Sequence, residues 1–158
     1  MNLVTTVFIS ALLALAGMPT AVAAGDVLDE TVSLRTEGDL LKAVSVTLQH
    51  AVVTSRQYRG TEPRLRSFAR REIETRGKPI AQLSKWGRFS SVPPKRLAIV
   101  PDDDASYLRA MLRNHAWLIE LIEFGNGLPL SNRTKRFMET LSREVVAEFS
   151  MLSRMEKL

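Results

Sequence analysis

The sequence predicts an all-α protein, an up-and-down four-helix bundle made of two helical hairpins with a Pro-containing crossover between them. Apolar residues recur at spacings of three and four in four stretches of about twenty residues, which is the period of amphipathic helices. No stretch shows the sustained two-residue alternation of a strand. Glycine and proline separate the stretches in two pairs, and short connections within each pair favour antiparallel neighbours.

The amino terminus predicts export. The first 24 residues contain no charged side chain, Val4 to Ala16 is mostly apolar, and small residues follow at 21–24. We therefore expect a signal peptide over 1–24, cut after Ala23 or Ala24, with an uncleaved anchor as the alternative. The apolar run is short for a membrane span, so no stable span is expected after cleavage. A polar lead-in over 25–36 and a bundle domain over 37–158 would remain, in the periplasm or secreted.

The first predicted hairpin starts at Thr36, which is placed to cap a helix together with Asp39 three residues later. Gly60 ends this helix. Thr61 then caps the second helix, and Pro63 is tolerated in its first turn. Gly77 and Pro79 interrupt its apolar stripe and predict a kink or break near 76–79, because proline removes a helical hydrogen bond. Gly87 ends the hairpin.

The second predicted hairpin follows a crossover over 88–101 that contains three prolines. The acidic run 102–104 should cap the third helix, where negative charge complements the helix dipole. The glycines at 125 and 127 end that helix, and Ser131 caps the fourth. The chain has no cysteine, which excludes disulfides, thiolate metal sites and a lipid-modified cysteine anchor.

Basic residues gather in one segment of the chain. Between Arg56 and Arg88 there are ten lysines and arginines but only three acidic residues. We expect a contact face on the second helix for an anionic envelope component or a protein partner, chiefly through Arg64, Arg66, Arg70 and Arg71. A solvated arginine-rich helix face is the alternative. Nucleic acid is not expected, because the chain is predicted to be exported and has few aromatics placed for base stacking.

Chemical motifs are few, and no enzymatic function is predicted. There is no Gly-x-Ser-x-Gly elbow, phosphate loop or dinucleotide fingerprint, and no Glu-x-x-His pair of the kind that di-iron bundles use. Met111 and His115 are four residues apart and share a helix face. Together with His50 and Glu148 they could hold copper, zinc or iron. The alternative is that His115 is a hydrogen-bonded core residue and that no cofactor binds.

Two segments resemble a known family of exported bacterial proteins, called domain of unknown function 4142. Residues 63–76 are similar to its second helix, and 103–115, with Tyr107-Leu108, Met111 and His115, to its third. A weaker similarity is to domain of unknown function 305, whose Met-x-x-His-His pattern is broken here by Asn114. The first resemblance implies a ferritin-like four-helix bundle with a secretion signal, no established reaction and a link to stress.

The departures from that family suggest one further contact. Where relatives commonly carry histidines in the second and fourth helices, this chain has Arg76 and Glu148. We therefore expect these two residues to form an ion pair. The leading functional prediction is a non-enzymatic binding or structural protein of the cell envelope, and the alternative is a small periplasmic metal-binding protein that uses His115.

Overall fold

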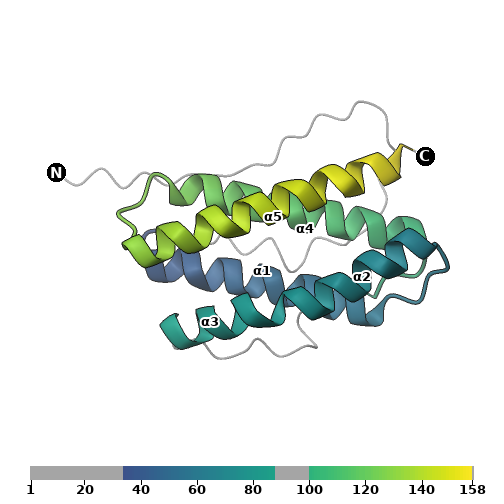
Figure 1. The fold of residues 1–158 in the computed structure, drawn as a ribbon, viewed down its shortest axis with the longest axis horizontal. Helices are drawn as coiled ribbons and strands as arrows, with labels where there is room; N and C mark the ends of the chain where they lie inside the picture. Colours follow the sequence, from purple (N-terminus) through teal and green to yellow (C-terminus); the bar gives the residue numbers. More distant parts are fainter. Residues whose placement is uncertain (1–33, 88–99, 158) are drawn as a thin grey trace.

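The computed structural model describes residues 34–87 and 100–157. It contains α1 (Glu37–Gln57), α2 (Pro63–Thr75), α3 (Gly77–Gly87), α4 (Asp104–Gly125) and α5 (Asn132–Glu156), and no strand within these residues. Helices α2 and α3 follow one another along one side, so the five elements make four packed rods (Figure 1). The all-α prediction and the number of packed helices are confirmed.

The helix starts show how the sequence sets the local structure. Thr36 forms the expected capping box, since its side chain accepts from the backbone of Asp39 and the Asp39 carboxylate accepts in return. Asp103 caps α4 and Ser131 caps α5. The prediction for α2 was wrong by one residue, because Glu62 rather than Thr61 caps it and accepts from the backbone N–H of Leu65 at 2.6 Å.

The expected break in the second rod lies at Arg76. Helix α2 ends at Thr75 and α3 begins at Gly77. Pro79 has no N–H to donate to the carbonyl of Thr75 four residues earlier, and this removes one hydrogen bond from the helical ladder. The ladder resumes at once, because the backbone N–H of Ile80 donates to the carbonyl of Arg76 at 3.2 Å. Both halves of the broken rod pack against α1.

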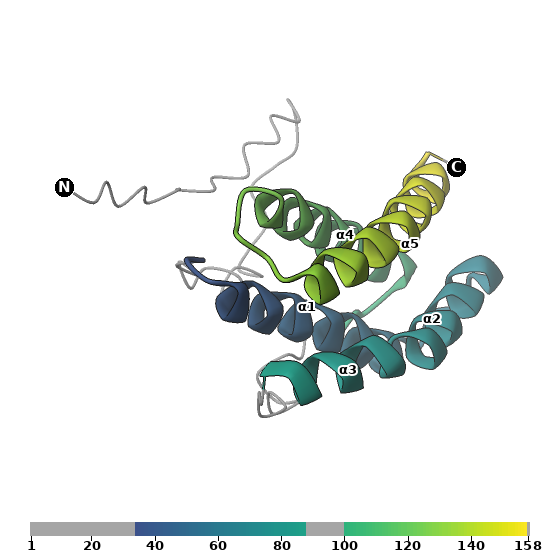
Figure 2. The ribbon, with the colours of Figure 1, turned by 60° about the vertical axis from the view of Figure 1, so that its left-hand side comes forward.

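Contacts at the two ends of the bundle fix the helix directions. At one end, Tyr58 after α1 stacks on Tyr107 in the first turns of α4, with ring centroids 4.1 Å apart. At the other end, the Glu37 carboxylate at the start of α1 accepts from the backbone of Ser131 at the start of α5, at 2.9 Å. Helices α1 and α5 therefore run in one direction, while α4 runs in the other, as does the α2–α3 rod (Figures 1 and 2).

Each hairpin is antiparallel, but the second and third rods run in the same direction, so the predicted alternating up-and-down order is wrong between the hairpins. The end of α3 and the start of α4 lie at opposite ends of the bundle, so a long connection is needed between them (Figure 1). Most of the predicted crossover lies outside the described residues, as do the predicted signal peptide and most of the polar lead-in. Within the described part, no helix is long and apolar enough to cross a membrane.

The core has α1 at its centre. Helix α1 packs against α2, α3 and α4, and α4 packs in turn against α5. The backbone of α5 approaches the α2–α3 rod less closely, and long side chains bridge this gap, which we call the α5 seam. At one end of the seam Trp86 meets Phe137 edge to face, with centroids 5.5 Å apart. Near the middle of the bundle, the side chains that span the α5 seam are polar.

Candidate functional site

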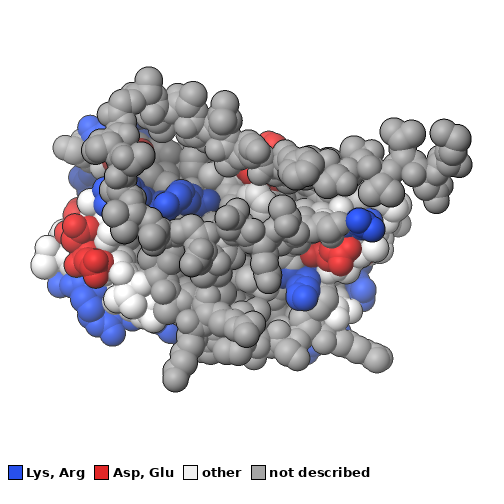
Figure 3. Space-filling model, turned by 180° about the vertical axis from the view of Figure 1, so that it is seen from behind, with Lys and Arg blue, Asp and Glu red and all other residues white. Residues whose placement is uncertain are grey.

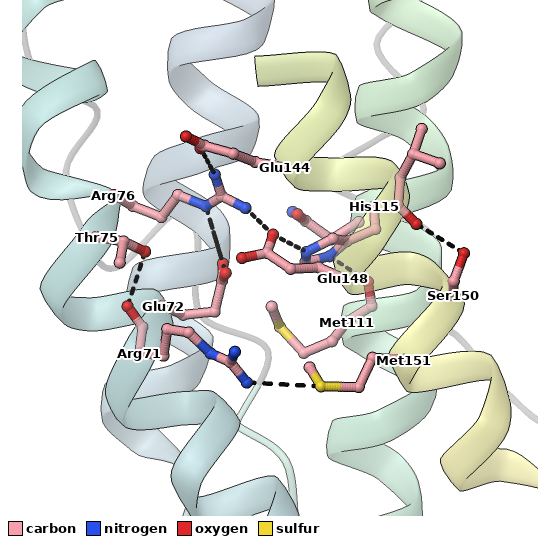
Figure 4. A network of polar contacts seen from close by, with 12 residues as sticks. Arg71, Glu72, Thr75, Arg76, Met111, His115, Glu144, Glu148, Ser150 and Met151 are labelled. Atoms are coloured by element: carbon pink, nitrogen blue, oxygen red, sulfur yellow. Dashed lines mark hydrogen bonds and ion pairs between the residues drawn. The ribbon is translucent and has the colours of Figure 1, made fainter. Parts of the chain in front are cut away.

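A buried arginine stands at the centre of a polar network in the α5 seam (Figure 4). Arg76 lies at the break between α2 and α3, and only 1% of its side chain is exposed. Its Nε lies 3.3 Å from Glu72 Oε1, its Nη1 lies 3.3 Å from Glu144 Oε2, and its Nη2 donates to Glu148 Oε2. Arg76 and Glu148, for which the sequence predicts an ion pair, therefore contact each other directly.

His115 connects this network to α4. Its Nδ1 lies 2.9 Å from the backbone carbonyl of Met111, and because a carbonyl can only accept, Nδ1 carries a proton. The other ring nitrogen, Nε2, lies 3.2 Å from Oε2 of Glu148. The bond to the carbonyl thus fixes the orientation of the ring and directs Nε2 into the cluster. The ring is fully buried and also packs against Phe68.

The pKa values of the two most buried carboxylates of the network are shifted in opposite directions. Burial raises the pKa of Glu72, which has no exposed surface, although Arg76 opposes this. Burial would also raise the pKa of Glu148, but the hydrogen bond with His115 and the charge of Arg76 outweigh it, so this pKa is lowered. Glu148 is therefore the ionised partner of Arg76, whereas Glu72 is the carboxylate that takes up a proton more readily.

The structure brings together part of the predicted metal-ligand set. His115 and Glu148 meet, whereas the contact that Met111 makes with the histidine is through its backbone carbonyl. His50 lies elsewhere, with its Nδ1 3.4 Å from Asn114, and burial lowers its pKa. In its place Glu72 joins the cluster, and one ligand atom each from Glu72, His115 and Glu148 lie within 4.8 Å of one another.

Glu72 is the residue that the sequence reasoning missed. It sits among arginines and is one of only three acidic residues in the basic segment 56–88. Its spacing carries the missing signal, since it follows Phe68 by four residues and Leu65 by seven and so falls on the buried face of α2. A charged residue on an apolar stripe requires a partner, and Arg76, four residues further on, is that partner.

The predicted contact face is exposed, and its arginines differ in whether they contact other parts of the protein. Arg64, Arg66, Arg70 and Arg71 are all exposed on α2. Arg66 donates to the carbonyl of Gly60 at 2.8 Å, and Arg71 reaches the sulfur of Met151 at 3.5 Å across the α5 seam. Seen from behind, the bundle shows basic side chains beside acidic ones at the end where α1 finishes and α2 begins (Figure 3).

No family model, curated protein or solved structure matches this chain. The helices and their contacts define the class of protein as an all-α bundle of four packed helices with a buried, arginine-centred ion network. The family resemblance given by the sequence stays an expectation.

Proposed function

We propose that this chain is an exported, non-enzymatic four-helix bundle that binds an anionic component of the cell envelope through α2. The observation that carries the proposal is the charge on that helix. Four arginines are exposed on α2, and Glu74 is the one exposed acid within its bounds. Such a surface attracts anions over a distance comparable to the Debye length, which is about 8 Å at physiological ionic strength.

The interior of the bundle suits a scaffold. Arg76 pairs with the carboxylate of Glu72 on α2 and with those of Glu144 and Glu148 on α5, and these contacts join the two helices in one network. The order of helix directions, with antiparallel hairpins and parallel second and third rods, also supports a ferritin-like arrangement as the resemblance implies. The predicted signal over 1–24 supports a periplasmic or secreted location.

Arg64 and Arg70 are the best candidates for direct contact with a ligand. Both are exposed, and within the described part of the chain neither makes a side-chain hydrogen bond or ion pair. Arg66 and Arg71 are partly engaged by Gly60 and Met151. Replacing Arg64 and Arg70 should therefore change binding without disturbing a contact that holds the bundle together.

The test uses cosedimentation of the purified mature protein with vesicles of phosphatidylglycerol and phosphatidylcholine, compared with phosphatidylcholine alone. We expect binding to the anionic vesicles only, and loss of that binding near 1 M salt, where the Debye length falls to about 3 Å. The variant Arg64→Gln/Arg70→Gln should bind more weakly. Its matched control removes the same charge from exposed positions on α5, with Lys135→Gln/Arg143→Gln.

Equal binding to both kinds of vesicle would contradict an electrostatic contact. An equal loss in the two double variants would show that overall charge, and not the face of α2, governs binding. The absence of binding to the anionic vesicles would remove the lipid surface as the anionic component.

The site of signal cleavage is tested separately. The mass of the protein recovered from the periplasm of an expressing bacterium should correspond to a chain that begins just after Ala23 or Ala24.

A further inference from the structure

We propose that Glu72, His115 and Glu148 form a three-ligand site for a divalent transition metal, and that Arg76 competes with the metal for this site. The inference concerns the interior of the bundle and does not depend on the exposed arginines of α2. It gives the metal-binding alternative a ligand set different from the one expected from the sequence, with Glu72 in place of His50 and Met111.

The geometry is that of ligands converging from separate helices. Glu72 comes from α2, His115 from α4 and Glu148 from α5, and their ligand atoms all lie within 4.8 Å of one another. Zinc binds nitrogen and carboxylate oxygen at about 2.0–2.2 Å, which places neighbouring ligands of a tetrahedral ion roughly 3.3–3.6 Å apart. Nε2 of His115 and Oε2 of Glu148 are already 3.2 Å apart. The remaining separations would need to close by at most about 1.5 Å.

Two further observations point to a cation ligand. Glu72 is fully buried, and its Oε2 accepts from Nε of Arg76 at 3.4 Å, whereas its Oε1 accepts no hydrogen bond, although the same nitrogen lies 3.3 Å away. A buried carboxylate oxygen without a donor is stabilised by a cation. In addition, Nδ1 of His115 donates to the carbonyl of Met111. Metal-binding histidines typically make such a bond, because it fixes the tautomer that turns the other nitrogen toward the ion.

Arg76 lies at the same place as the proposed ion. Its Nη2 contacts the Glu148 oxygen that faces His115, and its Nε faces Glu72, so its positive charge lies where an ion would lie. Glu144 offers a second partner toward the surface, since it is 53% exposed and one turn before Glu148 on α5. A guanidinium displaced by a metal would therefore keep an ion pair with Glu144 at the edge of the α5 seam.

The donor types define the class of ion. One imidazole and two carboxylates suit zinc, iron(II) or cobalt(II), whereas copper(I) prefers soft sulfur ligands. Three protein ligands would leave a fourth position for water. Cobalt(II) is a useful probe for such a site, because its visible absorption reports binding and tetrahedral geometry directly.

The experiment compares cobalt(II) titrations of the wild-type mature domain and the Arg76→Ala variant, followed by displacement with zinc. Removing a unit charge a few ångströms from the ion should tighten binding by about a hundredfold or more. Zinc should also raise the melting temperature of the variant, because a ligand of the folded state stabilises it. Adding either His115→Gln or Glu72→Gln to Arg76→Ala should abolish the absorption. Arg136→Ala, which removes an exposed arginine on α5, is the matched control and should bind as the wild type does.

Equal affinity in the wild type and Arg76→Ala, no binding in the variant, or binding that survives the loss of His115 would overturn the proposal. The variant leaves two buried carboxylates without their arginine and could be unfolded without metal. In that case it is titrated with zinc while circular dichroism is recorded. Folding that depends on zinc and is absent from Arg76→Ala/His115→Gln supports the site, and failure to fold with zinc, cobalt(II) or iron(II) overturns it.

Discussion

Replacement of Glu148 by glutamine tests whether the ion network holds α5 to the α2–α3 rod. The carboxylate of Glu148 is 14% exposed, and it accepts from Arg76 and faces His115 at 3.2 Å. The Glu148→Gln substitution keeps the size of the side chain but leaves the buried guanidinium without its main counterion. Breaking a buried pair from one side typically costs about 3–5 kcal/mol, because the remaining charge stays desolvated. We expect a decrease of that size in the free energy of unfolding.

The matched control is Glu144→Gln. Glu144 contacts the same guanidinium at 3.3 Å but is 53% exposed, so its loss should cost only about 0.2–1 kcal/mol. Both variants are measured by urea denaturation at pH 7, with the slope of the transition checked against the wild type, since an unchanged slope shows that stability alone has changed. If Glu148→Gln costs no more than Glu144→Gln, burial does not strengthen the pair and the reasoning is wrong.

Three further predictions concern single side chains. Because burial raises the pKa of Glu72 in the folded protein, its contribution to stability should decline as the pH rises above its ordinary pKa of 4.5, and Glu72→Gln should flatten this decline in urea denaturation at a series of pH values above 4.5. A methyl group added by Gly60→Ala would collide with the carboxylate of Asp104, and we expect a loss of about 1–3 kcal/mol by the same method. Tyr107→Phe should cost about 1 kcal/mol, because it removes a buried hydrogen bond of 2.8 Å with Ser55.

Each of these has its own control. Gly127→Ala places a methyl group 3.5 Å from the carbonyl of Phe124, an ordinary contact, so it should cost much less than the change at Gly60. Ser55→Ala combined with Tyr107→Phe should cost less than the sum of the two single changes, because both remove the same bond. For Glu72, a stability difference between the wild type and Glu72→Gln that shifts in favour of the wild type as the pH rises would show that ionisation of Glu72 is favoured in the folded state.

The fold was largely predictable because local signals and the core pattern agree. Thr36 with Asp39, Ser131 and the acidic run at 102–104 mark helix starts through side chains that satisfy unpaired backbone N–H groups, and these interactions are short in sequence. Pro79 marks the break for an equally local reason. The relative direction of the two hairpins is not determined by interactions between residues that are close in the sequence. It depends on contacts such as Tyr58 with Tyr107, which are 49 positions apart in the sequence.

The candidate site was predictable only in part, because helical spacing gives the face of a residue but not its partners across the bundle. The pairing of Arg76 with Glu148 was expected from the family resemblance and not from helical spacing. Met111 shares a face with His115, yet its carbonyl makes the contact. His50 lies on the buried side of α1 but pairs with Asn114. Which residues meet across two helices depends on how the helices pack, and the apolar periodicity of one helix does not determine that packing.

An arginine inside the bundle has a physical consequence that distinguishes it from a bound ion. A metal stabilises the folded state by an amount that grows with its free concentration, whereas the guanidinium of Arg76 belongs to the chain and is always present. The cost is the desolvation of a buried cation, which Glu148, Glu144 and Glu72 offset together. The network can therefore keep α5 against the α2–α3 rod whether or not metal is supplied, and Arg76→Ala should make that attachment depend on metal.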